Sequence, residues 1–135
     1  GNDVLNGGAG NDLLLGAEDN DLIEGGAGDG AQRGGGGFDT LGGNDGNDTL
    51  FGGIGTDTFV FGTGADVVED FTPGTDLIFL GPECQGITSF ADLAANHMAQ
   101  VGADVVITDA DGNTLTLLHT SLASLGQTSF VDFLI

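Results

Sequence analysis

The chain has 135 residues, of which 27 are glycine, and its 21 acidic residues against a single arginine give a formal charge of −20. This length fits one domain or a module of a larger protein. So negative a chain is excluded from binding nucleic acid or an anionic membrane surface. Fifteen of the acids lie within residues 1–76. An acidic run can also be a solvated or disordered segment.

Residues 1–69 follow a nine-residue period, which argues against disorder. After a truncated unit, GNDVLN, the chain divides without insertion into GGAGNDLLL, GAEDNDLIE, GGAGDGAQR, GGGGFDTLG, GNDGNDTLF, GGIGTDTFV and FGTGADVVE. In these seven repeats, glycine fills the first and the fourth place six times each, and aspartate fills the sixth place six times. Such a period is typical of a stacked solenoid whose turns present carboxylates in register.

The sixth place of each repeat is the candidate metal ligand. It holds Asp3, Asp12, Asp21, Asp39, Asp48, Asp57 and Asp66, and Gly30 is the one interruption. Glycine at the first, second and fourth places allows φ > 0, so that backbone carbonyls can turn toward one point. Ca²⁺ takes six to eight oxygen ligands, whereas His and Cys, which zinc or copper would prefer, are absent from residues 1–83. The pattern therefore predicts several Ca²⁺ ions.

The eighth place is apolar in every repeat but one, so we expect it to point into the interior. It holds Leu5, Leu14, Ile23, Gln32, Leu41, Leu50, Phe59 and Val68. The repeat that lacks aspartate at Gly30 is thus also irregular inside, with Gln32 at the inward place and Arg33 after it. So thin an interior cannot offset the entropy of ordering a glycine-rich chain, and facing carboxylates repel each other. We expect residues 1–80 to be disordered without calcium and to fold on binding it outside the cell.

These columns match G-G-x-G-x-D-x-U-x, and residues 1 to about 80 therefore resemble the RTX, or hemolysin-type calcium-binding, family. The resemblance implies an all-β fold, a right-handed parallel β-roll with two nonapeptides per turn, in which six residues turn and bind metal and three form a short strand. Stacked neighbours are then eighteen residues apart. One edge carries Asp3, Asp21, Asp39 and Asp57, and the other carries Asp12, Gly30, Asp48 and Asp66.

Each Ca²⁺ is expected between adjacent loops of one edge, where it would share two aspartates. Gaps beside Gly30 are expected to be weak or empty, although Asp29 is near enough in sequence to reach in. The expected carbonyl ligands are those of Gly7, Gly8, Gly10, Gly34, Gly35, Gly37, Gly43, Gly46, Gly52, Gly53 and Gly55.

Residues 66–80 are similar to the segment D-x-I-x-D-F-x-x-G-x-D-x-I-x-L that closes many RTX rolls. By that analogy Asp66 and Asp76 hold a last Ca²⁺. The alternative is a plain β-turn over residues 72–75 with Asp70 as its cap.

Residues 81–135 predict a small C-terminal cap on the 1–80 roll. Residues 89–99 begin with an N-cap serine and space apolar residues on one helical face. Strands at 104–108 and 114–118 form a hairpin, in which Asp109 and Asp111 are either metal ligands or ordinary turn residues. A helical turn at 121–125 and a strand at 128–135 complete a cap that covers the last edge of the solenoid.

The last four residues, Asp132 to Ile135, resemble the acid-plus-hydrophobic ending of serralysin-type proteins that type I ABC exporters secrete. A terminal strand docked on a core is the alternative. No stretch is apolar and long enough to cross a membrane, so no stable membrane insertion is expected. We expect a secreted bacterial protein with a covalently linked upstream domain.

Catalytic residues are not expected in this chain. Cys84 has no local partner, His97 and His119 belong to no triad or HExxH motif, and no Gly-Lys pair marks a phosphate loop. The leading hypothesis is a calcium-folded module that supports secretion of a larger protease, lipase, polysaccharide-modifying enzyme or toxin. A glycan- or protein-binding adhesion module is the alternative, although no Trp, Tyr or evident aromatic row supports it. An enzyme within the fragment itself is the third.

Overall fold

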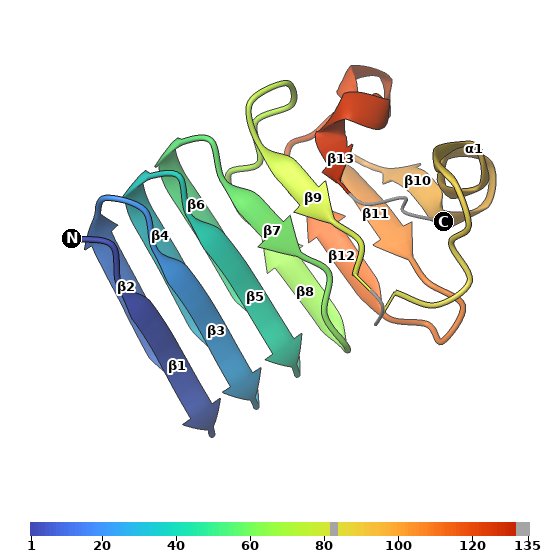
Figure 1. Cartoon of the computed structure of the whole chain (residues 1–135). Helices are drawn as coiled ribbons and strands as arrows, with labels where there is room; N and C mark the ends of the chain where they lie inside the picture. Colours follow the sequence, from blue (N-terminus) through green and yellow to red (C-terminus); the bar gives the residue numbers. More distant parts are fainter. Residues whose placement is uncertain (82–83, 132–135) are drawn as a thin grey trace.

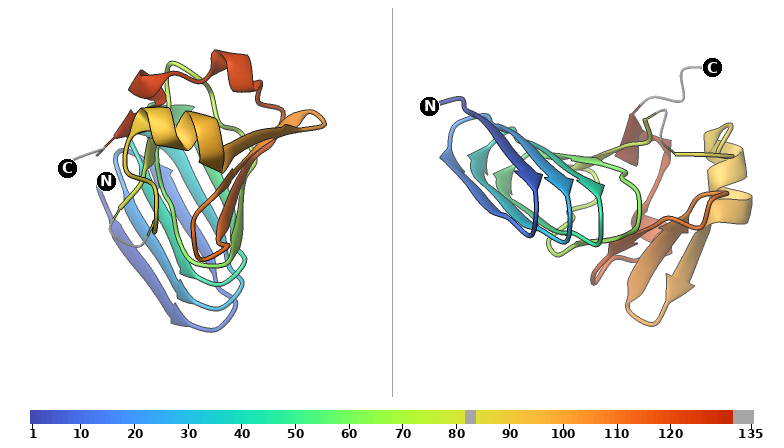
Figure 2. Two further views of the ribbon diagram at one scale, coloured as in Figure 1. Left: turned by 90° about the vertical axis from the view of Figure 1, so that its right-hand side faces the viewer. Right: turned by 90° about the horizontal axis from the view of Figure 1, so that it is seen from below.

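The computed structural model describes residues 1–81 and 84–131, whose strands form two sheets facing each other (Figures 1 and 2). The six-stranded sheet has the order β1 (Val4–Ala9), β3 (Leu22–Ala27), β5 (Thr40–Asp45), β7 (Thr58–Val60), β9 (Leu77–Phe79) and β13 (Phe130–Val131). The seven-stranded sheet has the order β10 (Met98–Val101), β11 (Asp104–Thr108), β12 (Thr114–Leu117), β8 (Ala65–Val68), β6 (Thr49–Gly55), β4 (Ala31–Gly37) and β2 (Leu13–Glu18). Up to β9, successive strands alternate between the sheets.

The N-terminal part is a flattened coil that advances one turn every eighteen residues. Val4 is in parallel register with Leu22, and Leu13 with Ala31. The all-β parallel roll with two nonapeptides per turn is thereby confirmed. The strands are longer than the three residues that the family resemblance implied, because pairing continues into the glycine-led turns, where Gly8 is in register with Gly26. Each strand of the first two coils has six or seven residues.

The interior of the coil is formed by the eighth place of each repeat, as predicted. Ile23, Leu41, Leu50, Phe59 and Val68 are fully buried, and the corresponding leucines of the first coil are half-buried. The first place also faces inward, but glycine there contributes no side chain, so a regular repeat adds a single apolar group. The last repeat adds a second, Phe61, at its first place. The core becomes broader toward the C-terminal region, where Leu93, Val105, Ile107, Leu115, Leu117 and Phe130 join it.

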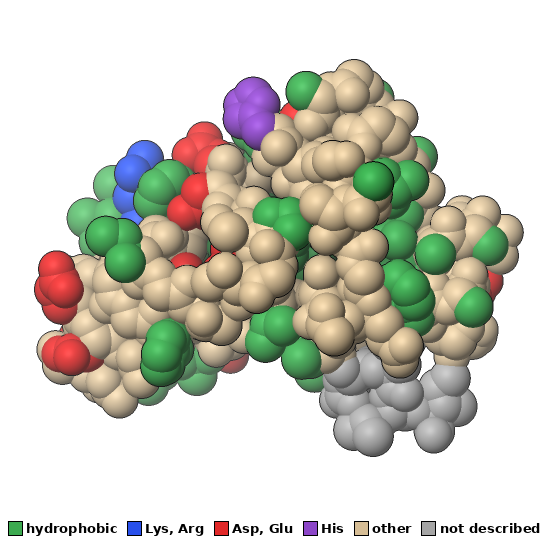
Figure 3. Space-filling view, turned by 90° about the horizontal axis from the view of Figure 1, so that it is seen from above, with side chains coloured by type: hydrophobic (Ala, Val, Ile, Leu, Met, Phe, Trp, Pro, Cys, Tyr) green, Lys and Arg blue, Asp and Glu red, His purple; other side chains and the backbone are tan. Residues whose placement is uncertain are grey.

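The irregular repeat also differs on the outer surface. Arg33 points outward from β4, and its guanidinium carbon lies 5.1 Å from the ring centroid of Phe51, its neighbour in register on β6. Figure 3 shows this single basic side chain on the coil beside apolar and acidic ones. The contact is a cation–π interaction. It holds the guanidinium group of the one arginine in position, and no carboxylate partner is required.

The C-terminal region begins with a helix that is shorter than predicted. Ser89 caps α1 (Phe90–Asp92), its Oγ accepting a hydrogen bond from the Asp92 N–H at 3.1 Å. The helix continues as the π-helical turn η1 (Leu93–His97) and ends before Met98, which opens β10. Nowhere in residues 1–81 and 84–131 is a helix long and apolar enough to cross a membrane.

Both sheets continue from the coil into the C-terminal region. β11 and β12 form the predicted antiparallel hairpin, with Thr108 opposite Thr114. β12 pairs in parallel with β8, and β13 pairs in parallel with β9, so both last edges of the coil are covered. Two short 3₁₀ turns, η2 (Leu122–Ser124) and η3 (Gln127–Ser129), precede β13, which starts at Phe130 rather than at residue 128. Residues 132–135, which carry the export-segment prediction, lie outside the described ranges.

Candidate metal centre

The sixth-place aspartates stack along two edges of the coil, where one sheet turns into the other. On the first edge the N–H of Asp21 donates to Oδ1 of Asp39 at 2.8 Å, and the N–H of Asp39 donates to Oδ1 of Asp57 at 3.0 Å. On the second edge the N–H of Asp48 donates to Oδ1 of Asp66 at 3.0 Å. Each carboxylate is therefore fixed through one oxygen by the backbone of the preceding coil.

The other carboxylate oxygen is buried and lacks a hydrogen-bond partner. This holds for Oδ2 of Asp12, Asp21, Asp39, Asp48 and Asp66 in the described part of the chain. The side chains of Asp39, Asp48 and Asp66 are each 1% exposed. Burying a carboxylate oxygen without a hydrogen bond or a counter-charge destabilises the folded state, so a positively charged partner would stabilise these sites.

Backbone carbonyls of the next coil approach these oxygens. A Cβ built on Gly34 would lie 2.7 Å from the carbonyl oxygen of Gly52 and would overlap Oδ2 of Asp39. The same arrangement repeats beside Gly16, where Oδ2 of Asp21 and the carbonyl oxygen of Gly34 approach one point. A carboxylate and a carbonyl that meet in this way are the ligand types of a hard cation. Within residues 1–81 and 84–131 no three His, Cys, Asp or Glu side chains gather, so carbonyls would have to complete such a site.

The glycine places serve two different purposes. The second and fourth places have positive φ, for example +118° at Gly35 and +147° at Gly37, as predicted. The first place does not have positive φ, and there the lack of a Cβ is what matters, because it leaves space beside the aspartate. The predicted carbonyl ligands fall into two groups. The carbonyl oxygens of the first group lie next to first-place glycines of the preceding coil; they belong to Gly34, Gly43 and Gly52. Those of the second group lie next to second- or fourth-place glycines of the following coil; they belong to Gly8, Gly10, Gly35, Gly37 and Gly46. Their role as ligands stays a prediction.

Asp76 lies on the first edge and not with Asp66. Its Oδ1 accepts from the N–H of Asp57 at 3.1 Å, and its Oδ2 accepts from the N–H of Thr72 at 2.8 Å. The predicted Ca²⁺ shared by Asp66 and Asp76 is therefore wrong, because β8 holds Asp66 in one sheet and β9 follows Asp76 in the other. The two residues end different edges of the coil.

The turn at residues 72–75 is present, but the Asp70 side chain does not cap it and instead accepts hydrogen bonds from the preceding coil. Its two carboxylate oxygens accept from the N–H groups of Gly52 and Gly53 at 2.9 and 2.8 Å, and the turn is closed by the Thr75 N–H on the carbonyl of Thr72. The eighteen-residue spacing between Gly52 and Asp70 was the signal for this contact.

Burial raises the pKa of the stacked aspartates. The effect brings the pKa of Asp57 to about 6 and that of Asp66 to about 7, and it also raises the pKa of Asp39, Asp48 and Asp76. Neighbouring carboxylates add to the effect, while backbone hydrogen bonds oppose it. Without a cation, protonation of Asp66 is therefore about half complete near pH 7, and that of Asp57 near pH 6.

A second ladder, which the sequence reasoning missed, runs outside the first. Fifth-place side chains accept the N–H of the residue one coil later, as Asn20 Oδ1 does from Phe38 at 2.9 Å and Asn47 Oδ1 from Ala65 at 2.9 Å. Asp29 belongs to this ladder, because its Oδ1 accepts from the N–H of Asn47 at 2.9 Å. The recurrence of Asn or Asp in the fifth column was the available signal.

The other sequence candidates have structural contacts. Asp109 Oδ1 accepts the N–H groups of Asp111 and Asn113, the arrangement of a hairpin turn and not of a metal pair. Burial raises the pKa of the Cys84 thiol to about 12, so it stays protonated. His97 Nδ1 lies 2.7 Å from the carbonyl oxygen of Thr108, and His119 is exposed.

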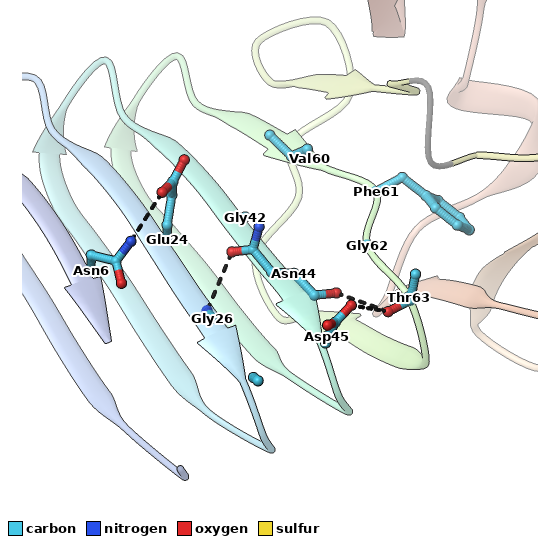
Figure 4. Close-up of a pocket in the computed structure, with 11 residues that line it drawn as sticks. Asn6, Glu24, Gly26, Gly42, Asn44, Asp45, Val60, Phe61, Gly62 and Thr63 are labelled. Atoms are coloured by element: carbon cyan, nitrogen blue, oxygen red, sulfur yellow. Dashed lines mark hydrogen bonds between the residues drawn. The ribbon is translucent and has the colours of Figure 1, made fainter. Parts of the chain in front are cut away.

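A groove of about 450 Å³ lies on the outer face of the six-stranded sheet (Figure 4). Its polar side chains contact one another along the stack: Asn6 donates to Glu24, and Thr63 Oγ1 donates to Asp45 Oδ1 at 2.7 Å. Phe61 borders the groove but is 1% exposed. The groove therefore presents no aromatic surface on which a sugar ring could stack.

The model of the RTX calcium-binding nonapeptide repeat matches residues 1–30 and 33–68, in four copies. The coils belong to this family. The RTX repeat module is non-catalytic in itself. No curated protein matches the chain.

Two solved structures resemble the RTX module. That of the extracellular lipase LipA from Serratia marcescens has a TM-score of 0.70 and 23% identity, and the match covers 93% of this chain and 20% of that one. The AlgE6R3 subunit of the Azotobacter vinelandii mannuronan C5-epimerase has a TM-score of 0.37 and 24% identity over 86% of this chain and 79% of that one. The likeness to LipA shows the fold, and this chain spans about a fifth of the length of that protein.

Proposed function

We propose that this RTX module folds when Ca²⁺ ions bind between successive coils, and that it does so outside the cell as part of a larger secreted protein. The observation that carries the proposal is the row of buried, unpartnered Oδ2 atoms, which Asp21 and Asp39 illustrate, each beside a carbonyl oxygen of the next coil. Both partners are oxygen atoms, and a divalent cation satisfies them together while the carboxylate stays ionised.

The ligands are the sixth-place aspartates, helped by glycine carbonyls. On the first edge, stacked carboxylates border a series of gaps from Asp3 to Asp57, and Asp76 extends it by one. On the second edge, Asp48 and Asp66 border a regular gap. Between Asp12 and Asp48 the series is interrupted by Gly30, where metal affinity is expected to be lower.

Calcium supplies the cohesion that the interior does not. A regular repeat with glycine at its first place buries one apolar side chain, and each aspartate is held close to carboxylates of its neighbours, an interaction that a bound divalent cation reverses in sign. The free energy of binding then contributes directly to folding. Extracellular calcium modules bind with Kd of about 10⁻⁴–10⁻³ M, so the module stays unfolded in a calcium-poor cytosol and folds after export.

Secretion by a type I ABC exporter fits this order of events. An unfolded glycine-rich chain is suited to passage through an exporter, and the ending Asp132–Ile135 is the proposed signal. The active domain of the parent, whether protease, lipase, polysaccharide-modifying enzyme or toxin, would then lie upstream.

A calcium titration followed by far-UV circular dichroism tests the proposal. The chain in chelator should give the spectrum of a largely disordered protein and should gain the β-sheet signal over about 0.1–1 mM Ca²⁺. Mg²⁺ at the same concentration is the control, because it requires a small octahedral site and should leave the chain unfolded. A β-sheet spectrum that is the same in chelator and in excess Ca²⁺ would overturn the proposal.

A further inference from the structure

The repeat that lacks aspartate has a buried polar side chain instead. Gln32, at the inward eighth place of the repeat that contains Gly30, is 1% exposed, and neither its amide nitrogen nor its amide oxygen has a hydrogen-bond partner. Its neighbours in register are Leu14 on β2 and Leu50 on β6. A buried amide without partners is unfavourable compared with leucine at the same place. The matched family segments stop at residue 30 and resume at 33, leaving Gln32 out.

The Gln32 amide occupies the place that an aspartate carboxylate occupies in the regular repeats. A Cβ built on Gly43 would lie 2.5 Å from Oδ2 of Asp48, and one on Gly34 would overlap Oδ2 of Asp39. At Gly25, the first place of the irregular repeat, the atom met is the amide nitrogen Nε2 of Gln32, together with the carbonyl oxygen of Gly43 at 2.6 Å. The long side chain has thus crossed the interior to the position left by the missing carboxylate.

No other side chain of the described residues competes for this position. Asp29, the nearest acid in the sequence, is exposed, and its Oδ1 accepts the N–H of Asn47 on the outer ladder. Gly30 itself donates its N–H to Oδ1 of Asp48 at 2.7 Å, so the hydrogen bond of the regular edge is kept and Oδ2 of Asp48 is left without a partner. The gap therefore has the backbone of a regular site and an amide in place of one carboxylate.

We propose that Gln32 is a neutral ligand of a Ca²⁺ ion bound between the coils that carry Gly30 and Asp48. The amide oxygen replaces the absent carboxylate, next to the carbonyl oxygen of Gly43. The inference rests on the proposed calcium-driven folding. Asn and Gln carbonyls are normal calcium ligands, and rotating the amide by about 180° brings either atom to the cation side. With one negative charge fewer, this is the weakest site of the coil, because affinity follows the charge of the ligands.

The test counts bound calcium by equilibrium dialysis and native mass spectrometry on the full chain and its variants Gln32→Leu and Gln32→Glu. Gln32→Leu, which completes a column of leucines, should bind one Ca²⁺ fewer than the parent. In chelator with an osmolyte that populates the metal-free fold, it should unfold at higher temperature than the parent. Gln32→Glu should keep the parent's count, bind the weakest ion about tenfold more tightly, and be less stable than Gln32→Leu in chelator. Asp39→Ala, which leaves no side-chain oxygen at a regular gap, is the positive control for loss of an ion.

Three outcomes decide the matter. Equal calcium counts in the parent and in Gln32→Leu would overturn the assignment, while leaving calcium-driven folding in place. A lower stability of Gln32→Leu in chelator would also overturn it, because the amide would then act as a donor to carboxylates in place of a cation. Absence of bound calcium in the parent would instead contradict the proposed function itself.

Discussion

Two buried aspartates, one in the C-terminal hairpin and one in the coil, have pKa values shifted in opposite directions. Asp109 is 4% exposed, and both its oxygens accept hydrogen bonds, from the N–H groups of Gln85, Asp111 and Asn113 and from the Asn113 amide. Burial acts to raise its pKa, but these donors outweigh it and the pKa is lowered. Asp39 is 1% exposed, has one such bond and an unpartnered Oδ2, and its pKa is raised by burial.

The difference shows what each region requires from outside the chain. The hairpin turn aims enough donors at its carboxylate to keep it ionised without help. In the coil, one backbone N–H donates to each stacked carboxylate, because the N–H of the following residue is already hydrogen-bonded within the sheet. The second carboxylate oxygen is therefore left for a cation. Stability should therefore depend on calcium in the coil and be independent of it in the hairpin.

The largest effect is expected where the close approach of the coils is broken. Gly34→Ala would place a Cβ 2.7 Å from the carbonyl oxygen of Gly52 and against Asp39. Since a backbone atom must move, we expect a loss of about 3 kcal/mol or more in calcium, measured by urea unfolding. Gly36→Ala is the control, because its Cβ would be 3.2 Å from the flexible end of Glu18. Equal losses for the two variants would mean that the first-place glycine is not needed for space.

Removing the carboxylates themselves tests the comparison directly. Asp109→Asn should cost about 2–3 kcal/mol with or without calcium, because buried donors lose a charged acceptor. Asp39→Asn should be destabilising in calcium and neutral or stabilising in chelator, because it removes a buried charge that only the cation compensates. Thermal unfolding in millimolar Ca²⁺, and in chelator with an osmolyte that populates the metal-free fold, measures both. A calcium-dependent effect of Asp109→Asn would contradict the distinction.

Between about pH 5 and pH 8, a change of pH should act through the aspartates of the coil. Asp57 and Asp66 have pKa values raised to about 6 and about 7, so the folded coil without metal binds more protons than the unfolded chain. The stability that these groups contribute is fully present below about pH 4, the unfolded pKa, and is lost as pH rises through about 6 and 7. In chelator, the folded state should be favoured at about pH 6 over about pH 8 by roughly 2 kcal/mol.

Saturating calcium should reverse that dependence, because the ion requires ionised carboxylates and competes with protons. Circular dichroism at the same two pH values, with and without calcium, separates the two cases. A metal-free coil that is more stable at the higher pH would contradict the raised pKa values.

The coil could be predicted because its constraints repeat. The columns of glycine, aspartate and apolar residues are enough to define the register, the two edges and the inward side chains. The joint site of Asp66 and Asp76 was wrong because the nine-residue count ends at Glu69, after which only the fold determines the edge to which an aspartate belongs. Gln32 could be recognised from the sequence as irregular. That its amide comes close to Gly25 could not be predicted, because this depends on the distance between the two sheets. The C-terminal strand that pairs with β9 was expected, while its start at Phe130 was set by tertiary contacts.

The smallest effect is expected at a turn where the coil lacks a preferred glycine. Ala17 occupies a second place with φ of +86°, which L-residues rarely adopt, whereas most repeats have glycine there. Ala17→Gly should stabilise the folded coil by about 0.5–1 kcal/mol in calcium, the relief of backbone strain exceeding the added entropy of the unfolded chain. Ala27→Gly, at a third place where φ is not positive, is the matched control and should be destabilising by a similar amount. If both variants were destabilising in urea unfolding, the positive φ at Ala17 would cost less than the flexibility that glycine adds, and the turns would not require glycine for their conformation.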